Sequence, residues 1–156
     1  MHPFFVILAV ISSLSSLASA ASRLYVFNNC TFPVYPWGVD PVPPSENAHL
    51  PPFQEEFYVM WPRPMGNSIK VTTGLWDGVP RIAFTYDGGT NGMFYVLNNE
   101  FGDPFEYFPV TATPLNPTGP RCDPIHWPNG LNPGGHTPVR TCPLNTNFRL
   151  TLCGTG

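Results

Sequence analysis

Charged side chains are scarce in this sequence. They make up 11% of the chain, Lys70 is the only lysine, and the formal net charge is −3. A surface with so few cations is a poor match for the phosphates of a nucleic acid or for an anionic membrane. We therefore expect no nucleic acid among the partners of this protein.

An apolar run long enough to cross a bilayer is also missing. The longest run, residues 4–14, falls short of the roughly 20 apolar residues that a spanning helix needs. Ala18-Ser19-Ala20 follows it and has the small-x-small pattern that a signal peptidase recognises. The sequence predicts a signal peptide at residues 1–20 and a single mature domain at residues 21–156. We expect this domain to be secreted, extracellular or bound to a cell wall, with no membrane partner after cleavage.

Helical periodicity is absent, whereas proline, glycine and aromatic residues are abundant. The chain has 21 prolines and 14 glycines, and aromatic residues make up 14% of it. Rigid turns between short runs of β-branched and aromatic residues predict an all-β sandwich of short antiparallel strands with long Pro/Gly-rich loops. We expect a proline-rich connection at residues 41–52, a hairpin connection at residues 87–92, and a first pair of strands at residues 23–27 and 33–37. The other expected strands are residues 57–61, 68–72, 81–86, 93–97, 108–113, 137–141 and 148–152.

Four cysteines lie in the predicted mature chain. An even number of cysteines in an exported chain indicates disulfides, and no Cys-x-x-Cys pair is present to suggest zinc. Four cysteines allow three connectivities. Their positions favour Cys30–Cys153, which ties the first strand to the last, and Cys122–Cys142, which closes a loop of about twenty residues. The alternative is that the neighbours Cys142 and Cys153 pair instead.

Asn29-Cys30-Thr31 is a formal N-glycosylation sequon. Its asparagine stands beside a cysteine that we expect to be paired, which opposes glycan attachment.

Several stretches, in order along the chain, are similar to a known family. They include Asn28-Asn29-Cys30, Pro33-Val34-Tyr35 with Trp37, the stretch 101–105, the stretch 125–130 and Leu150-Thr151-Leu152-Cys153. Together they resemble the small fungal thaumatin-like proteins of the yeast-phase-specific antigen family. The resemblance implies a secreted fungal protein with a thaumatin-like β-sandwich, and it supports the pairing of the first cysteine with the last.

The same resemblance bears on function. Larger plant thaumatin-like proteins bind β-1,3-glucan in an acidic cleft, and some have weak glucanase activity. Those proteins have many more disulfides and an additional loop-rich domain. Family members often carry an acidic residue directly after the position of Tyr95, where this chain has Val96. An acidic site is therefore not carried over by the resemblance.

Catalytic and metal-binding motifs are missing from the sequence. It has no Gly-x-Ser-x-Gly and no His-Glu-x-x-His, and His49, His126 and His136 all fall in predicted loops. Glycoside hydrolysis needs two converging carboxylates, and loops or strand ends could supply them. The candidates are Asp77, Asp87, Glu100, Asp103 and Glu106. Turn positions explain these acids more simply, so we assign no catalytic residue, metal or cofactor.

Tryptophans in turn-like settings are the stronger functional signal. Trp76-Asp77-Gly78 and the stretch 126–130 around Trp127 predict indoles presented by loops. Exposed aromatic rings offer flat platforms for sugar rings, although a small domain can also use them as core. We favour core for Trp37 and leave both readings open for Trp76 and Trp127. The predicted ligand-binding residues are Trp76, Asp77, Asp103 and Trp127.

These residues predict a secreted, non-enzymatic protein that binds a β-glucan-type wall polysaccharide. One alternative is an effector or antigen that binds a host protein. The other is a weak β-1,3-glucanase that uses two of the loop carboxylates.

Overall fold

The computed structural model describes residues 21–38, 49–61, 66–76, 78–89, 92–116, 122–135 and 137–154. The predicted signal peptide, Asp77, His136 and most of the proline-rich connection lie outside the described residues. Within the described ranges the regular structure is all β, and no helix there is long and apolar enough to cross a membrane. The strands are β1 (Ser22–Asn28), β2 (Tyr35–Trp37), β3 (Gln54–Met60), β4 (Asn67–Thr72), β5 (Arg81–Gly89), β6 (Gly92–Glu100), β7 (Val110–Pro114), β8 (Ile125–Trp127), β9 (Arg140–Cys142) and β10 (Phe148–Leu152).

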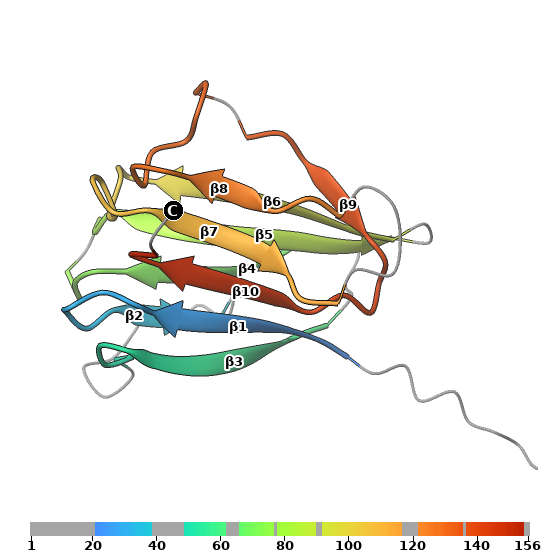
Figure 1. Ribbon diagram of the computed structural model, residues 1–156, viewed down its shortest axis with the longest axis horizontal. Coiled ribbons are helices and arrows are strands. Elements are labelled where there is room, and N and C mark those ends of the chain that lie inside the picture. Colours follow the sequence, from blue (N-terminus) through green and yellow to red (C-terminus); the bar gives the residue numbers. More distant parts are fainter. Residues whose placement is uncertain are drawn as a thin grey trace, which may run out of the picture.

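The strands form two five-stranded sheets that pack face to face (Figure 1). The first sheet has the order β3-β1-β10-β7-β8, and the second has the order β2-β4-β5-β6-β9. The predicted two-layer, all-β architecture is therefore correct. The expectation of purely antiparallel strands is wrong at one pair, because β1 lies parallel to β10, with Leu24 opposite Phe148 and Asn28 opposite Leu152.

The core lies between the inner faces of the two sheets. Along β5, Ile82, Phe84 and Tyr86 alternate with outward residues and are all buried, as the period-two pattern predicts. Phe148 of the first sheet meets two rings of the second, with ring centroids 5.2 Å from Phe84 and 4.6 Å from Tyr95. These aromatic contacts join the two layers at the centre of the sandwich.

The hairpin between β5 and β6 was predicted from its glycines and is confirmed. The two strands pair from Arg81 opposite Glu100 to Gly89 opposite Gly92, and both are longer than the sequence indicated. Gly92 has a φ of 138°, and a Cβ there would approach the Cys142 carbonyl oxygen to 2.6 Å. Glycine is therefore required at this position both for its backbone conformation and for the close approach of β9.

Three details of the predicted strand arrangement are wrong. The segments expected as a first pair lie in different sheets, because β1 pairs with β3 and β10 while β2 pairs with β4. The strand predicted at 137–141 begins only at Arg140. The stretch around Trp127, expected to be a loop, forms β8, a short strand that pairs with β7 at the edge of the first sheet.

Two disulfides staple the sandwich, in the pairing that the cysteine positions favoured. Cys30–Cys153 joins the segments that follow β1 and β10, with its Cα atoms 5.0 Å apart. Cys122–Cys142 ties the approach to β8 to the end of β9, with its Cα atoms 4.6 Å apart. The backbone amide of Asn29 donates to the Leu152 carbonyl oxygen at 3.0 Å, and its side-chain amide donates to the Cys153 carbonyl oxygen at 2.9 Å.

Candidate functional site at the loop end

Several connections meet at one end of the sandwich, which we call the loop end. The strand registers place the turn between β4 and β5, the connection from β6 to β7 and the entry to β3 at this end, which is the left side of Figure 1. The segments of residues 101–109 and 128–130 also touch there, since the Tyr107 amide donates to the Asn129 carbonyl oxygen at 2.9 Å. The connection from β6 to β7 and the segment after β8 therefore contact each other at this end.

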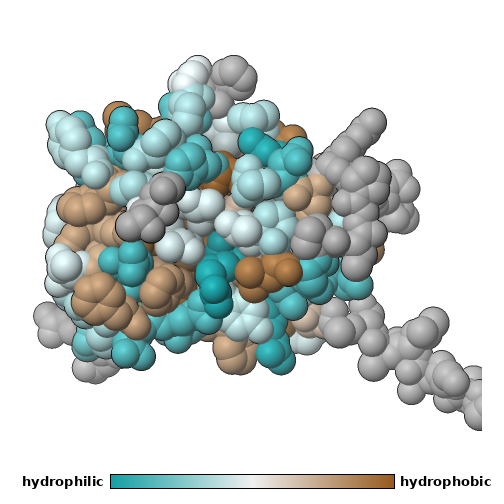
Figure 2. Space-filling view, in the orientation of Figure 1, coloured by the Kyte–Doolittle hydropathy of each residue, from teal (hydrophilic) through white to brown (hydrophobic). Residues whose placement is uncertain are grey.

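Aromatic side chains gather at this end. Phe53, Trp76, Phe101 and Tyr107, which we call the aromatic surface, are 60%, 60%, 67% and 81% exposed. Figure 2 shows a group of light brown, hydrophobic side chains near the left end of the molecule and further brown side chains at its centre. Large rings with this much solvent contact add little to the core. Exposed apolar side chains of this kind are typical of a surface that binds another molecule.

The backbone holds three of these rings in an unfavourable conformation. Phe53, Phe101 and Tyr107 have φ values of 61°, 62° and 74°, in the left-handed region that bulky residues seldom adopt. Such residues each cost about 1–3 kcal/mol and persist only where the surroundings fix them. Phe53 is fixed by its amide, which donates to the Asn28 carbonyl oxygen at 2.6 Å. Strain at exposed aromatic positions marks this end as a candidate for recognition.

Trp76 is presented by the turn between β4 and β5, as its sequence setting predicted. Its indole lies on Gly74, where an added Cβ would come within 1.6 Å of the ring. The Thr72 hydroxyl donates to the Gly74 carbonyl oxygen at 2.8 Å, and the Val79 amide donates to the Trp76 carbonyl oxygen at 3.2 Å. The turn therefore holds the ring against a glycine and leaves one face toward solvent.

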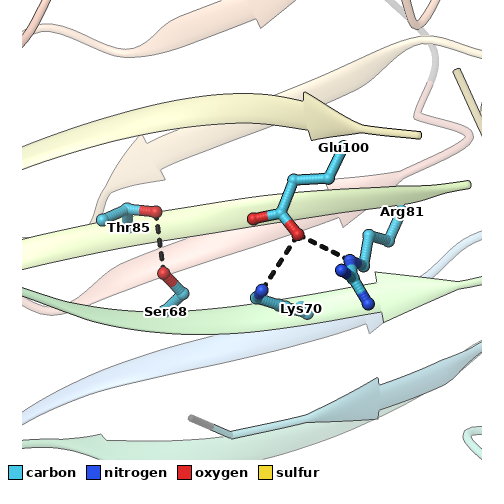
Figure 3. Close-up of polar contacts among 5 residues, drawn as sticks. All are labelled: Ser68, Lys70, Arg81, Thr85 and Glu100. Atoms are coloured by element: carbon cyan, nitrogen blue, oxygen red, sulfur yellow. Dashed lines mark hydrogen bonds and ion pairs between the residues drawn. The ribbon is translucent and has the colours of Figure 1, made fainter. Parts of the chain in front are cut away.

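A strip of charged residues lies beside the aromatic surface on the outer face of the second sheet. Glu100 of β6 binds the Lys70 ammonium of β4 at 2.9 Å and the Arg81 guanidinium of β5 at 2.5 Å (Figure 3). Further along the same strands, the Ser68 and Thr85 hydroxyls are hydrogen-bonded at 2.8 Å. We call Lys70, Arg81 and Glu100 the charged strip.

The charged strip and the aromatic surface are in contact through Arg81. Its guanidinium carbon lies 4.6 Å from the centre of the Phe101 ring and 6.0 Å from that of Trp37, within the range of a cation–π interaction. Burial raises the pKa of Glu100, but the hydrogen bonds from Lys70 and Arg81 outweigh it, so its pKa lies below the ordinary value. The strip therefore carries an ionised carboxylate and two cations at neutral pH.

The acidic residues considered at the sequence level do not all come together. Asp103 and Glu106 lie at the loop end, where the Asp103 carboxylate accepts a hydrogen bond from the Asn99 amide and its carbonyl oxygen accepts one from the Glu106 amide at 3.3 Å. The Glu106 carboxylate is hydrogen-bonded to the Tyr107 hydroxyl and raises the pKa of that phenol. Asp87 lies near the hairpin at the opposite end of β5.

Trp127 does not belong to this surface. It is 1% exposed and is the largest fully buried side chain among the described residues, because the inward face of β8 directs it between the sheets. The hypothesis that a loop presents Trp127 to a ligand is therefore wrong. The sequence analysis also did not predict the charged strip or the positive φ angles of Phe53, Phe101 and Tyr107.

Comparison with known proteins shows a shared fold and a family. The crystal structure of the protein elicitor MoHrip2 from Magnaporthe oryzae is similar to this chain, with a TM-score of 0.66 and 24% sequence identity over 86% of this chain and 100% of that one. At this identity the likeness shows the fold alone. Among proteins with curated functions, none matches this sequence. The family model described as the Blastomyces yeast-phase-specific protein matches residues 11–154. Because that match covers nearly the whole sequence, the chain belongs to the family of the Blastomyces yeast-phase-specific protein.

Proposed function

We propose that this protein is a secreted recognition protein of the effector or antigen type, and that its loop end binds a β-glucan-type wall polysaccharide. Membership of the yeast-phase-specific family and the fold shared with a protein elicitor support the general role. The observation that carries the finer proposal is the set of exposed rings at one end of the sandwich. We also retain the thaumatin-like relationship as a proposal, on the resemblance of the sequence stretches alone.

The chemistry of the loop end suits a neutral sugar polymer. Aromatic faces pack against the C–H faces of sugar rings, and rings spaced along one end would contact successive units of an extended chain. The charged strip offers fixed donors on Lys70 and Arg81 and acceptors on Glu100 for hydroxyl groups. Since these groups already pair with one another, they are held in place before a ligand arrives, which lowers the entropy cost of binding.

We propose that this binding occurs without catalysis. A glycosidase needs one carboxylic acid with a raised pKa as its proton donor. The pKa of Glu100 is shifted in the opposite direction by its two cationic neighbours. The Asp103 carboxylate accepts a hydrogen bond from the Asn99 amide and so stabilises the turn after β6. A weak β-1,3-glucanase therefore remains the less favoured alternative.

A pelleting assay tests the proposal. The mature protein is incubated with insoluble β-1,3-glucan, cellulose or chitin, and then the pellet is assayed for protein and the supernatant for released sugars. We expect selective pelleting with β-1,3-glucan and no released sugar. Trp76→Ala should weaken this binding about tenfold, as for a central aromatic contact. Trp61→Ala is the matched control, because Trp61 is 57% exposed but follows β3 at the opposite end of the sandwich.

A second variant tests whether the orientation of the Trp76 ring matters for binding. Gly74→Ala keeps the Trp76 side chain but adds a Cβ that would lie 1.6 Å from the indole, so the ring must move. This variant should weaken glucan binding while leaving the fold intact. If the protein stays soluble with every polymer, or if Trp61→Ala weakens binding as much as Trp76→Ala, the loop end is not a glucan site. A host-protein partner that soluble glucan cannot displace would then be the better hypothesis.

A further inference from the structure

The free edge of β3 differs from the other three edges of the two sheets. The strands at those edges, β2, β8 and β9, have three residues each. Prolines stand in or beside them: Pro36 within β2, Pro124 and Pro128 around β8, and Pro143 after β9. Short strands and prolines keep a sheet edge from pairing with another chain. β3 has seven residues and no proline, so it lacks both of these protections.

β3 forms a regular edge of the first sheet (Figure 1). It pairs with β1 without interruption, from Ser22 opposite Met60 to Asn28 opposite Gln54. In the described part of the chain, no strand pairs with its other side. An edge strand leaves alternate backbone N–H and C=O groups unpaired, and a further extended strand can bind these groups and continue the sheet. The backbone of β3 is therefore able to bind one more strand.

The outward side chains of β3 and β1 vary along this edge. Glu55, Phe57 and Val59 alternate with inward residues, and Phe57 and Val59 are 52% and 37% exposed. Arg23 of β1 stands opposite Val59, with its guanidinium carbon 4.8 Å from the centre of the Phe57 ring. Among the described residues, Arg23 forms no ion pair with a carboxylate. The edge is therefore acidic near its start, apolar in its middle and cationic near its end.

This order of groups is complementary to itself when two copies of the edge run in opposite directions. The Glu55 end of each copy then meets the Arg23 end of the other, whereas a parallel arrangement would bring the two Glu55 carboxylates together. The distance can be spanned, because Arg149 of β10 already binds Glu55 across β1 at 2.7 Å. Arg23 of β1 would likewise extend across β3 to reach Glu55 of a second copy. A second copy of the chain therefore supplies a matching group for each end of this edge.

We propose that β3 pairs with β3 of a second copy of this protein, antiparallel and about a two-fold axis. The pairing joins the first sheets of the two copies into one continuous sheet and gives a closed, symmetric dimer. Phe57 and Val59 of the two copies pack against one another between the charged pairs. Because the entry to β3 lies at the loop end, the two loop ends point in opposite directions. The dimer does not depend on the proposed glucan binding.

Sedimentation equilibrium of the mature protein, over a series of concentrations up to the millimolar range, tests the proposal. We expect a reversible equilibrium between monomer and dimer. Hydrogen exchange locates the interface, since the amides of β3 should exchange more slowly as the dimer forms while those of β8, at the opposite edge of the same sheet, should not change. A protein that is monomeric at every concentration, or a dimer in which β3 is not protected, would overturn the proposal. In the first case a strand of a different protein would be the better candidate for this edge.

A lysine on the edge tests the apolar contact. Val59→Lys should weaken dimerisation at least about tenfold, because it places a charge in the apolar middle of the interface. Val139→Lys is the matched control, since Val139 is 64% exposed and precedes β9, at one edge of the second sheet. β3 lies beside the other edge of that sheet, where the Tyr58 hydroxyl donates to the Pro36 carbonyl oxygen of β2 at 3.2 Å. Equal weakening by the two lysines would place the interface somewhere other than β3.

Two charge reversals test the antiparallel arrangement. Arg23→Glu and Glu55→Arg should each self-associate at least about tenfold more weakly than the parent protein, because each brings like charges together across the two-fold axis. Mixed in equal amounts, the two variants should form a heterodimer, since each copy then supplies the charge that the other lacks. A mixture that stays monomeric while both variants are folded would contradict the two-fold pairing. If Glu55→Arg fails to fold, Val59→Lys and hydrogen exchange still decide the question.

Discussion

Removing the disulfides one at a time should destabilise the protein by unequal amounts. We consider two double variants, Cys30→Ala with Cys153→Ala and Cys122→Ala with Cys142→Ala. Cys30–Cys153 spans 123 positions of the sequence and Cys122–Cys142 spans 20. In the chain-entropy model a disulfide stabilises by restricting the unfolded chain, so the longer loop contributes more. The model gives about 4.9 kcal/mol for the long loop and about 3.3 kcal/mol for the short one.

The assay is equilibrium unfolding in urea at neutral pH, with both double variants and the parent protein. We expect a lower midpoint for each variant, with the Cys30–Cys153 variant less stable than the other by about 1.6 kcal/mol. The slope of the transition should rise in both variants, since an unfolded chain without the crosslink exposes more surface. A loss from the Cys122–Cys142 variant as large as that from the Cys30–Cys153 variant would refute the entropic reasoning.

Three further results are expected. Glu100→Gln should cost about 1 kcal/mol at neutral pH. Because the folded pKa of Glu100 is lowered, its stabilisation is present above the unfolded pKa and is lost as the pH falls through the folded pKa, so stability curves of parent and variant should converge in acid. Trp127→Ala should cost about 3–5 kcal/mol in urea unfolding because it opens a core cavity, whereas Trp76→Ala should change stability by about 0.5 kcal/mol or less. Asn29 should carry no glycan, because its side-chain amide is bonded to the Cys153 carbonyl oxygen; an intact mass that drops on glycosidase treatment would contradict this.

Local patterns predicted the strands whose neighbours are close in sequence. The alternation of Ile82, Phe84 and Tyr86 and the glycines after Asp87 were enough to place the hairpin of β5 and β6. The parallel pairing of β1 with β10 joins segments at opposite ends of the domain, and no local pattern indicates it. β8 was missed because Pro124 and Pro128 flank only three residues, and proline normally signals a turn. An edge strand tolerates flanking prolines because one side of it needs no partner.

The candidate site was predictable only in part. Trp76 followed from its turn-like setting, while Trp127 was misplaced because the same kind of setting surrounds a three-residue strand. The charged strip depends on register across three strands, so it is not visible as a motif. One clue was present: a hairpin register with Gly89 opposite Gly92 also places Arg81 opposite Glu100. Phe53 and Tyr107 have positive φ angles. The sequence does not indicate such angles at residues other than glycine.

The central place of β1 and β10 in the first sheet has a consequence for biosynthesis. β10 lies between β1 and β7, so the sheet cannot close until residues 148–152 have been made. Contacts between such distant segments form slowly, on the order of milliseconds to seconds. During synthesis β1 and β7 therefore remain without their shared neighbour until the end of the chain has been made. A product truncated before β10 would expose two unpaired strand edges and should be removed by proteolysis or aggregate.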